Sequence, residues 1–327
     1  MPDYDVISYG SYKVDSASNI GGVVRGKITQ IYGESGAGKS TFVVLLMISA
    51  QRTNPDLMVG FIDCEQAFNM DYAIKLGLDT SADRFFLVQP DSANQGLDMY
   101  LRFLKSGLFS LVALDSIPAL VPEQDLEADV GDHQVATLAR MLSKEMRRIM
   151  NYSKQTNTAA VLINQIRNGI GFGSPEKVLP GGQAVKFYPS VNIELKRKDL
   201  IGKQDHWIGQ NIQANFVKNR FGSPYKKAEF KLYYGEGIRK GEEAVEVAAD
   251  LGIISRGGAW YTFPLADGTT ARLQGMASVQ EYYDLHPADF ANLDSLVLKS
   301  FEKTKEVVED LDKHPDEDSL ELEEDDS

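Results

Sequence analysis

The chain has few of the residues that build disulfides and zinc sites. Of its 327 residues, one is a cysteine, Cys64, and four are histidines. A single cysteine excludes an intramolecular disulfide and fits a reducing compartment, so we expect a cytoplasmic protein in which Cys64 simply packs. One cysteine and four scattered histidines also lack the ligand spacing of a common zinc site.

Long hydrophobic runs are missing as well. No segment is apolar over enough residues to cross a bilayer, and no secretory signal precedes the first strand-like segment, so we expect no membrane partner. The hydrophobic and charged fractions, 43% and 25%, are those of an ordinary globular protein. The length predicts one large domain and a smaller one.

Acidic residues outnumber basic ones, and most of the excess lies at the carboxyl end of the chain. The net charge is −13, and residues 306–327 contain 12 Asp or Glu and one Lys, so they carry −11 and the rest of the chain carries −2. The body is therefore near neutral and can have basic faces. The acidic end has too little apolar surface to order itself. It either solubilises the protein or mimics polyphosphate and competes for a basic DNA groove.

Glycines are concentrated in one segment near the amino terminus. Gly33, Glu34, Ser35, Gly36, Ala37, Gly38, Lys39 and Ser40 fit the phosphate-binding pattern G-x-x-x-x-G-K-[ST] at every fixed position. A strand-like run, 27–32, precedes this segment and a helical run, 41–50, follows it, which argues against a chance glycine-rich turn. Backbone amides and the helix N-terminus would bind phosphate, with Thr41 as a nearby donor. Lys39 would neutralise the β- and γ-phosphates and Ser40 would ligate Mg²⁺, so we expect ATP and Mg²⁺ as cofactors.

Apolar runs alternate with helical patterns through the first half of the chain. Strands are predicted at 58–63, 85–89, 110–115 and 159–165, and helices at 40–52, 69–76, 94–106 and 133–154. The strands are continuous apolar runs, which is typical of a parallel sheet covered by helices on both faces, with substrate at the carboxyl ends of the strands.

Beyond residue 190 the pattern changes. Strands at 191–197, 210–218 and 227–234 predict an antiparallel extension of the sheet. A helix at 244–251, a strand at 259–263 and helices at 278–286 and 288–310 predict a small second domain. We expect an α/β core over residues 1–237, a small α/β domain over 238–303 and a disordered acidic tail over 304–327.

Polar residues end three of the buried strands. Asp115 would hold the hydration shell of Mg²⁺, so the expected metal ligands are Ser40 and Asp115. Glu65 would polarise a water for attack on the γ-phosphate, which would make the protein a hydrolase; the alternative is a surface acid. Gln165 would touch the γ-phosphate. The loop after Gln165 contains Arg167 and Phe172 and is rich in glycine, as expected for a loop that binds single-stranded nucleic acid.

Taken together, these motifs resemble those of RecA-type recombinases over nearly the full chain. The matching stretches are 7–11, 31–35, 61–65, 73–77, 114–116, 163–167, 181–188, 218–219 and 234–238. The resemblance implies a RecA-like P-loop ATPase core, and it separates the chain from replicative helicases with the same core.

The resemblance also implies residue roles. Glu65 matches the family's catalytic glutamate, and Gln165 matches its γ-phosphate sensor. Tyr72 matches the aromatic residue that stacks on adenine. Asn69 stands at the position where the family has an acidic residue that contacts the adenine base. Segments 123–133 and 166–182 match the two DNA-binding loops. Lys218 and Arg220 match cations that reach the neighbouring subunit's ATP. The residues that match DNA-backbone contacts are Arg140, Ser143, Arg147, Arg167, Gly181 and Gly182. Three of these, Arg140, Ser143 and Arg147, share one helix face, although such a face is commonly just solvated.

The function implied by the resemblance is a DNA-dependent ATPase that forms filaments on single-stranded DNA and exchanges strands with homologous duplex DNA. Single-strand-binding or loading proteins are open as further partners. Two alternatives remain: an accessory RecA-like protein that builds no filament, and a P-loop kinase, which lacks a lid pattern. One departure from the family motivates the first alternative, and a second concerns the details of the DNA-binding loop. The chain begins almost at the core, so we expect most of the N-terminal docking segment to be missing, and the loop before Phe172 is short.

Overall fold

The computed structural model describes residues 4–120, 133–168 and 177–313. The chain divides into two compact units, Met1–Arg239 and Lys240–Ser327. The first unit contains the predicted phosphate-binding segment. The helices among the described residues are all too short or too polar to cross a membrane.

An eight-stranded sheet forms the centre of the first unit, with the strand order β12-β11-β10-β3-β7-β6-β4-β5. Six strands run parallel to one another: β3 (Ile28–Gly33), β4 (Met58–Asp63), β5 (Phe85–Val88), β6 (Phe109–Asp115), β7 (Ala159–Gln165) and β10 (Val191–Lys203). β11 (His206–Asn219) and β12 (Lys227–Tyr233) add to the sheet antiparallel. The predicted fold class, a parallel sheet with an antiparallel extension, is confirmed.

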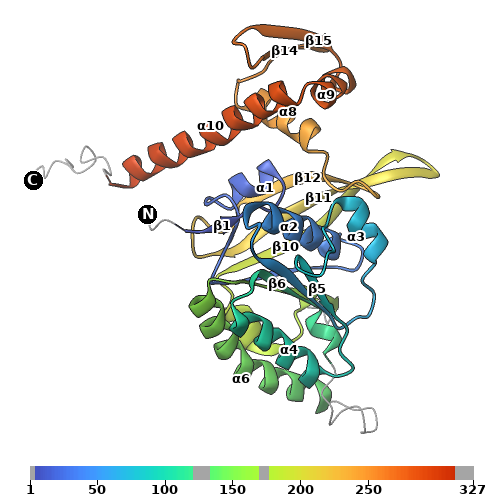
Figure 1. The fold of residues 1–327 in the computed structure, drawn as a ribbon, viewed down its shortest axis with the longest axis vertical. Helices are drawn as coiled ribbons and strands as arrows, with labels where there is room; N and C mark the ends of the chain where they lie inside the picture. The colour runs from blue at the N-terminus through green and yellow to red at the C-terminus, as the bar shows by residue number, and fades with distance from the viewer. Residues whose placement is uncertain (1–3, 121–132, 169–176, 314–327) are drawn as a thin grey trace, which may run out of the picture. The chain divides into compact units, whose positions relative to one another are not determined.

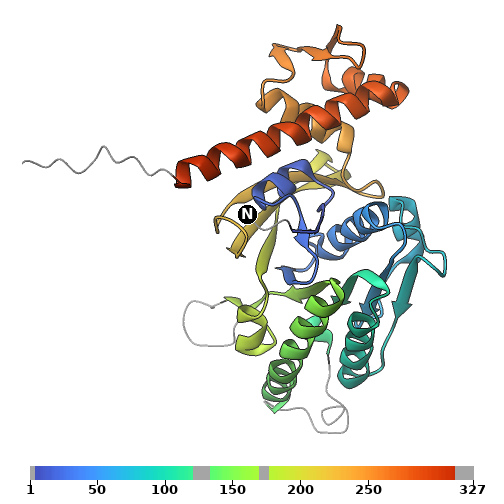
Figure 2. The ribbon, with the colours of Figure 1, turned by 60° about the vertical axis from the view of Figure 1, so that its left-hand side comes forward.

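Helices cover both faces of this sheet (Figure 1). One face carries α2 (Lys39–Thr53) and α3 (Met70–Leu76), with α1 (Tyr12–Ala17) against the extension. The other face carries α4 (Ala93–Ser106), α6 (His133–Thr156) and the short α7 (Gly182–Phe187). α4 and α6 lie side by side in Figure 2. A small ladder of β1 (Val6–Ile7) with β2 (Val23–Val24) and a 3₁₀ turn at Ile117–Ala119 complete this layer structure.

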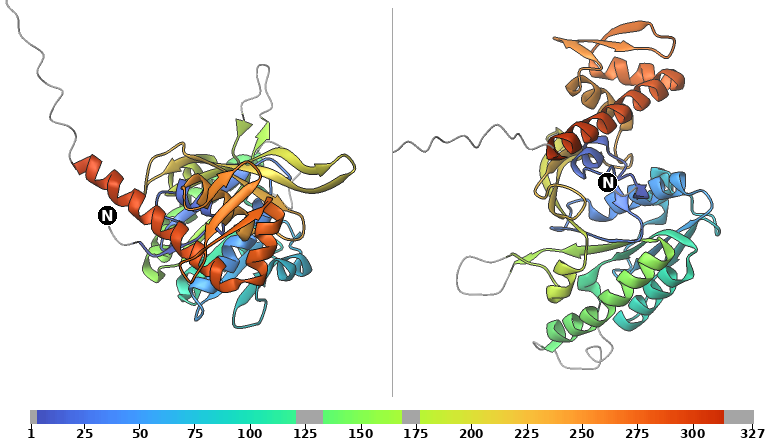
Figure 3. Two further views of the ribbon diagram at one scale, coloured as in Figure 1. Left: turned by 90° about the horizontal axis from the view of Figure 1, so that it is seen from above. Right: turned by 90° about the vertical axis from the view of Figure 1, so that its left-hand side faces the viewer.

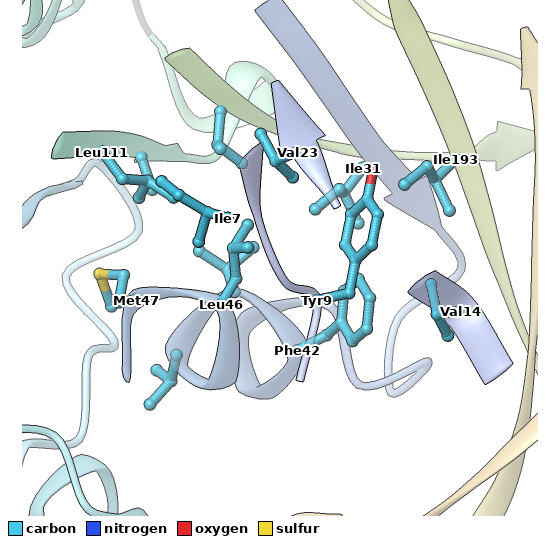
Figure 4. Packing of buried hydrophobic residues seen from close by; sticks show 14 of the residues in the cluster. Ile7, Tyr9, Val14, Val23, Ile31, Phe42, Leu46, Met47, Leu111 and Ile193 are labelled. Atoms are coloured by element: carbon cyan, nitrogen blue, oxygen red, sulfur yellow. The ribbon is translucent and has the colours of Figure 1, made fainter. Parts of the chain in front are cut away.

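The two faces of the sheet build two separate hydrophobic cores. Ile31 and Val161 face the core under α2, whereas Ile28 and Leu162, from the same two strands, face α4 and α6. This alternation explains why the central strands read as continuous apolar runs, since every residue of β3 and β6 is buried on one side or the other. Figure 4 shows the core under α2, where the Tyr9 and Phe42 rings stack with their centroids 5.8 Å apart.

The β10–β11 hairpin is longer than predicted and extends past the rest of the sheet (Figure 3). Register shifts interrupt the pairing between Arg197 and Leu200 and again between Ile201 and Gly202. Residues 196–200 are exposed, so this part of the hairpin has no core-facing apolar pattern from which its length could be predicted. A second, two-residue ladder joins β8 (Arg167–Asn168) to β9 (Lys177–Val178).

The second unit combines helices with a three-stranded sheet. Its elements are α8 (Lys240–Asp250), β13 (Ser255–Gly257), β14 (Trp260–Pro264), β15 (Thr270–Gln274), α9 (Met276–Leu285) and α10 (Pro287–Lys313). Phe263, Val279, Tyr283 and Leu293 are buried in it. The sequence analysis predicted one strand here where the structure has three, because β13 and β15 are short and exposed.

Candidate active site

The predicted phosphate-binding segment forms a tight loop between β3 and α2. Gly36 and Gly38 have φ values of +75° and +80°, and Gly38 is the N-cap of α2. These are left-handed conformations that favour glycine. A Cβ atom on Gly33 would collide with the carbonyl oxygen of Leu195 on β10. The loop therefore needs its glycines for backbone conformation and for close packing, and it leads directly into a helix N-terminus, which favours bound anions.

Lys39 lies buried inside this loop. Its Nζ donates to the carbonyl oxygens of Gly33 at 3.2 Å and Glu34 at 2.8 Å. Burial lowers the pKa of the Lys39 ammonium, and the nearby carboxylates of Asp115 and Glu65 oppose that shift. The ammonium is thus held at the inner side of the loop by neutral carbonyls, partners that a phosphate oxygen would outcompete because it carries charge.

Ser40 and Asp115 meet although they are far apart in the sequence. The Ser40 hydroxyl donates to Asp115 Oδ2 at 2.6 Å. Asp115 is almost fully buried, and burial raises its pKa to about 6; the hydrogen bond from Ser40 opposes this shift, and the charges of Glu65 and Asp63 add to it. A hydroxyl and a carboxylate are hard oxygen ligands of the kind that Mg²⁺ prefers.

Glu65 and Gln165 also lie together. Gln165 Nε2 donates to Glu65 Oε1 at 2.6 Å, and the Ser116 hydroxyl donates to the same oxygen. The sheet explains this convergence, because Gly33 pairs with Gln165 in register and Asp63 pairs with Asp115. The carboxyl ends of β3, β7, β6 and β4 therefore line one edge of the sheet.

Two residues without a predicted role position this edge. Asp63 is buried and accepts hydrogen bonds from the Phe68 amide and from Gln89 Nε2, both at 2.9 Å, which fixes the loop that carries Glu65. Ser116 orients the Glu65 carboxylate. Asp63 and Ser116 lie within the matching stretches 61–65 and 114–116. Nothing in the spacing of these residues reveals which partner each one contacts.

The predicted DNA loop connects to Gln165 through its neighbour. Asn164 Oδ1 accepts a hydrogen bond from the backbone N–H of Gln165, and Asn164 Nδ2 donates to the Pro180 carbonyl at 3.0 Å. Gly181, the N-cap of α7, follows with a φ of +97°. Residues 169–176, with Phe172, lie outside the described residues, as do residues 123–132 of the other predicted loop, 123–133; for Arg167 the structure describes the backbone.

The other predicted DNA contacts lie next to this segment. Arg140, Ser143 and Arg147 are exposed on α6. A Cβ on Gly182 would lie 2.9 Å from the Cβ of Ala139 on α6, so Gly182 brings α7 close to Arg140. Ser143 donates its hydroxyl to the Ala139 carbonyl at 2.7 Å. These residues thus share one region of the surface with the end of the loop.

Lys218 and Arg220 are not part of the same cluster. Both donate to the Phe187 carbonyl at the end of α7, at 2.7 Å and 3.5 Å. Burial lowers the pKa of Lys218, and the charge of Arg220 adds to this effect. In register, Lys218 pairs with Asn192 and Asn192 with Gln30 in the middle of β3, whereas the phosphate loop begins after Gly33 at the carboxyl end of β3. Arg220 donates its backbone N–H to the Ser190 carbonyl, and Ser190 donates to that of Ile28 at the start of β3. Both cations therefore lie away from the strand end that carries their own phosphate loop.

The predicted base contacts lie at the start of α3. Asn69 is the N-cap of this helix, and its Oδ1 accepts from the Tyr72 amide at 2.9 Å. Tyr72 is half-buried. The cap explains why an Asn suits this position, since a short side chain with an oxygen acceptor stabilises a helix N-terminus.

Comparisons with known proteins match this architecture. The model of the RecA N-terminal domain matches residues 1–239. The chain is 37% identical over 296 residues to "Protein RecA" of Heliobacterium modesticaldum, covering 90% of this chain and 83% of that protein. It is 38% identical over 320 residues to "Protein RecA" of Pseudarthrobacter chlorophenolicus, covering 97% and 88%. The chain therefore belongs to the RecA family of recombinases and is a DNA-dependent ATPase.

Proposed function

We propose that the protein binds ATP and Mg²⁺, assembles into a helical filament on single-stranded DNA, and catalyses pairing and strand exchange with homologous duplex DNA. ATP hydrolysis takes place between subunits and is stimulated by the DNA strand. A cytoplasmic location agrees with the single cysteine, Cys64, which forms no intramolecular disulfide.

The observation that carries this proposal is a series of hydrogen bonds that connects the carboxyl ends of the parallel strands, where nucleotide would bind, with the predicted DNA loop. It runs from Glu65 to Gln165, and from Asn164, the neighbour of Gln165, to the Pro180 carbonyl. A γ-phosphate at the end of the phosphate loop would compete with Glu65 for the side-chain amide group, Nε2, of Gln165. Because Gln165 moves with Asn164, nucleotide state would reach the loop that ends at Pro180.

For the remaining side chains we propose the roles that the phosphate-binding motif and the family resemblance imply. Lys39 binds the β- and γ-phosphates, and Glu65 accepts the proton of the attacking water. Ser40 and Asp115, whose oxygens lie 2.6 Å apart, would hold Mg²⁺ directly or through its water shell. When bound, Mg²⁺ would neutralise the charge that develops on the phosphates. Asn69 and Tyr72 contact the base.

The location of Lys218 and Arg220 supports an ATP site shared between subunits. Because these cations lie away from the strand end that carries their own phosphate loop, they would complete the site of a neighbouring copy. An interface that joins two different surfaces of the same protein repeats head to tail, and it gives an open helical assembly unless the rotation closes into a ring.

ATP turnover with and without single-stranded DNA tests the proposal. We expect strong stimulation by the DNA and a complete loss of turnover in Lys39→Ala. Arg102→Ala is a matched control, because Arg102 is 72% exposed on α4 and pairs with Asp98 in its own helix. A rate of ATP turnover that is the same with and without single-stranded DNA would contradict the proposal. Particles of one or two subunits in light scattering with ATP and DNA would favour an accessory role.

A further inference from the structure

The phosphate loop rests against the antiparallel extension of the sheet. A Cβ on Gly38 would lie 2.8 Å from Ile212 Cδ1 on β11 and 2.9 Å from Leu232 Cδ2 on β12. A Cβ on Gly33 would collide with the carbonyl oxygen of Leu195 on the neighbouring parallel strand β10. β10 and the two strands of the extension, β11 and β12, thus contact the loop.

One polar side chain stands among these contacts. Gln210 on β11 is 4% exposed, and its Nε2 donates to the Gly36 carbonyl at 3.2 Å. A Cβ on Gly38 would lie 3.4 Å from the same nitrogen. The amide therefore spans Gly36 and Gly38, the two glycines with left-handed backbone. Gln210 pairs with Leu200 on β10 and Leu232 on β12, so its backbone is fixed by strands on both sides.

The bond to Gly36 fixes the orientation of one peptide plane. The Gly36 carbonyl and the Ala37 N–H belong to the same trans peptide and point in opposite directions. With the carbonyl turned outward to Gln210, the Ala37 N–H points into the loop. There it makes a long hydrogen bond of 3.3 Å to the Glu34 carbonyl, which also accepts from Lys39 at 2.8 Å.

We propose that Gln210 is a positioning residue for nucleotide phosphate. It holds the Gly36–Ala37 peptide so that the Ala37 N–H faces the phosphate-binding side of the loop before nucleotide arrives. A preorganised donor costs no reorganisation when the anion binds. The role rests on the proposed function in that nucleotide is the ligand, and it assigns part of the affinity to the sheet extension, outside the phosphate-binding motif.

The variant Gln210→Met keeps a side chain of similar length and removes the donor. We expect the dissociation constant of a fluorescent ADP analogue, measured without DNA, to rise roughly 2- to 12-fold, the range for one lost hydrogen bond. The KM for ATP in DNA-stimulated turnover should rise by the same factor while kcat stays within about twofold, because the bond stabilises ground state and transition state alike. The control is Gln213→Met on the same strand, since Gln213 donates instead to Glu229 Oε1 at 2.7 Å.

The variant Gln210→Glu separates positioning from packing. Its ionised carboxylate would face the Gly36 carbonyl without a proton to donate, so affinity relative to the unsubstituted protein should be low at about pH 8. Protonation toward about pH 5.5 restores a donor, and the difference from the unsubstituted protein should narrow. A packing role predicts no such pH dependence.

Unchanged nucleotide affinity in Gln210→Met, or a pH-independent deficit in Gln210→Glu, would overturn the assignment. If the unsubstituted protein bound no adenine nucleotide, the proposed function would fail, and this role with it. Melting temperatures of all three variants show whether the compared samples are folded.

Discussion

At the residue scale, Asp115 carries a charge that the fold holds away from water. Burial raises its pKa to about 6, so the folded state disfavours the ionised form relative to the unfolded chain. The resulting cost to stability is fully present above the folded pKa and disappears as the pH falls toward the ordinary carboxyl range. Near neutral pH this cost is on the order of 3 kcal/mol.

We therefore expect Asp115→Asn to stabilise the nucleotide-free protein while abolishing DNA-stimulated ATP turnover. The gain in melting temperature should be larger at about pH 7.5 than at about pH 5, because protonation relieves the same cost in the unsubstituted protein. Thermal unfolding at both pH values measures it. A variant that is less stable than the unsubstituted protein at neutral pH would show that the Ser40 hydrogen bond outweighs the desolvation of the carboxylate.

Asn69 offers a second prediction at this scale. Its Oδ1 caps α3 through the Tyr72 amide, so Asn69→Ala should cost about 1 kcal/mol of unfolding free energy. Asn69→Asp keeps the cap and should retain stability. If the base lies here, both variants change the ratio of ATP to GTP turnover, because Nδ2 is the donor that each one removes. Denaturant titration and turnover with the two nucleotides check both parts, and an unchanged ratio would place the base elsewhere.

The residues at the strand ends were predictable, and those that support them were not. Glu65, Asp115 and Gln165 end buried parallel strands, and the register of such strands brings their ends to one edge. Gln210 and Asp63 contact residues that are distant in sequence, Gly36 and Gln89. No periodicity marks such contacts, because they depend on how the strands of the sheet and the loops at their ends pack in three dimensions.

At the scale of elements, α7 links the predicted DNA loop to Lys218 on β11 and to Arg220 just after that strand. It begins after Gly181 and ends at Phe187, whose carbonyl accepts from Lys218 and Arg220. Six residues are too few to give a helical period, which is why the sequence did not reveal this helix. The buried strands differ from this helix, because an apolar run of six or seven residues is long enough to predict a strand. β4 and β7 accordingly have the predicted bounds.

Gly181 allows α7 to pack closely. A Cβ there would lie 2.7 Å from Val185 Cγ2 and 3.0 Å from Leu142 Cδ1, at a φ of +97°. Gly77 has a φ of +105° with nothing within 4 Å, which makes Gly77→Ala the matched control. Both substitutions should cost roughly 1–2 kcal/mol for the backbone, and Gly181→Ala roughly 1–3 kcal/mol more for overpacking. Denaturant titration compares them, and equal losses would contradict the packing of α7 described here.

At the scale of the whole molecule, charge is divided between the body and the carboxyl end. Residues 306–327 carry −11 of the net −13. If these acids compete with DNA phosphates, removing residues 306–327 should tighten binding to single-stranded DNA and weaken its dependence on Mg²⁺. Fluorescence anisotropy over a salt series measures both. An unchanged salt dependence would leave the segment with a solubilising role.

In the proposed filament, Lys218 and Arg220 of a neighbouring subunit complete each ATP site on DNA. Mixing two inactive variants tests this most directly: Lys39→Ala lacks the phosphate-binding lysine, and the double variant Lys218→Ala with Arg220→Ala lacks the cations. In an equal mixture, head-to-tail contacts pair an intact phosphate loop with intact cations at about one quarter of the interfaces. We predict that turnover returns to about that fraction when single-stranded DNA is present. A mixture as inactive as its two components would contradict the shared site.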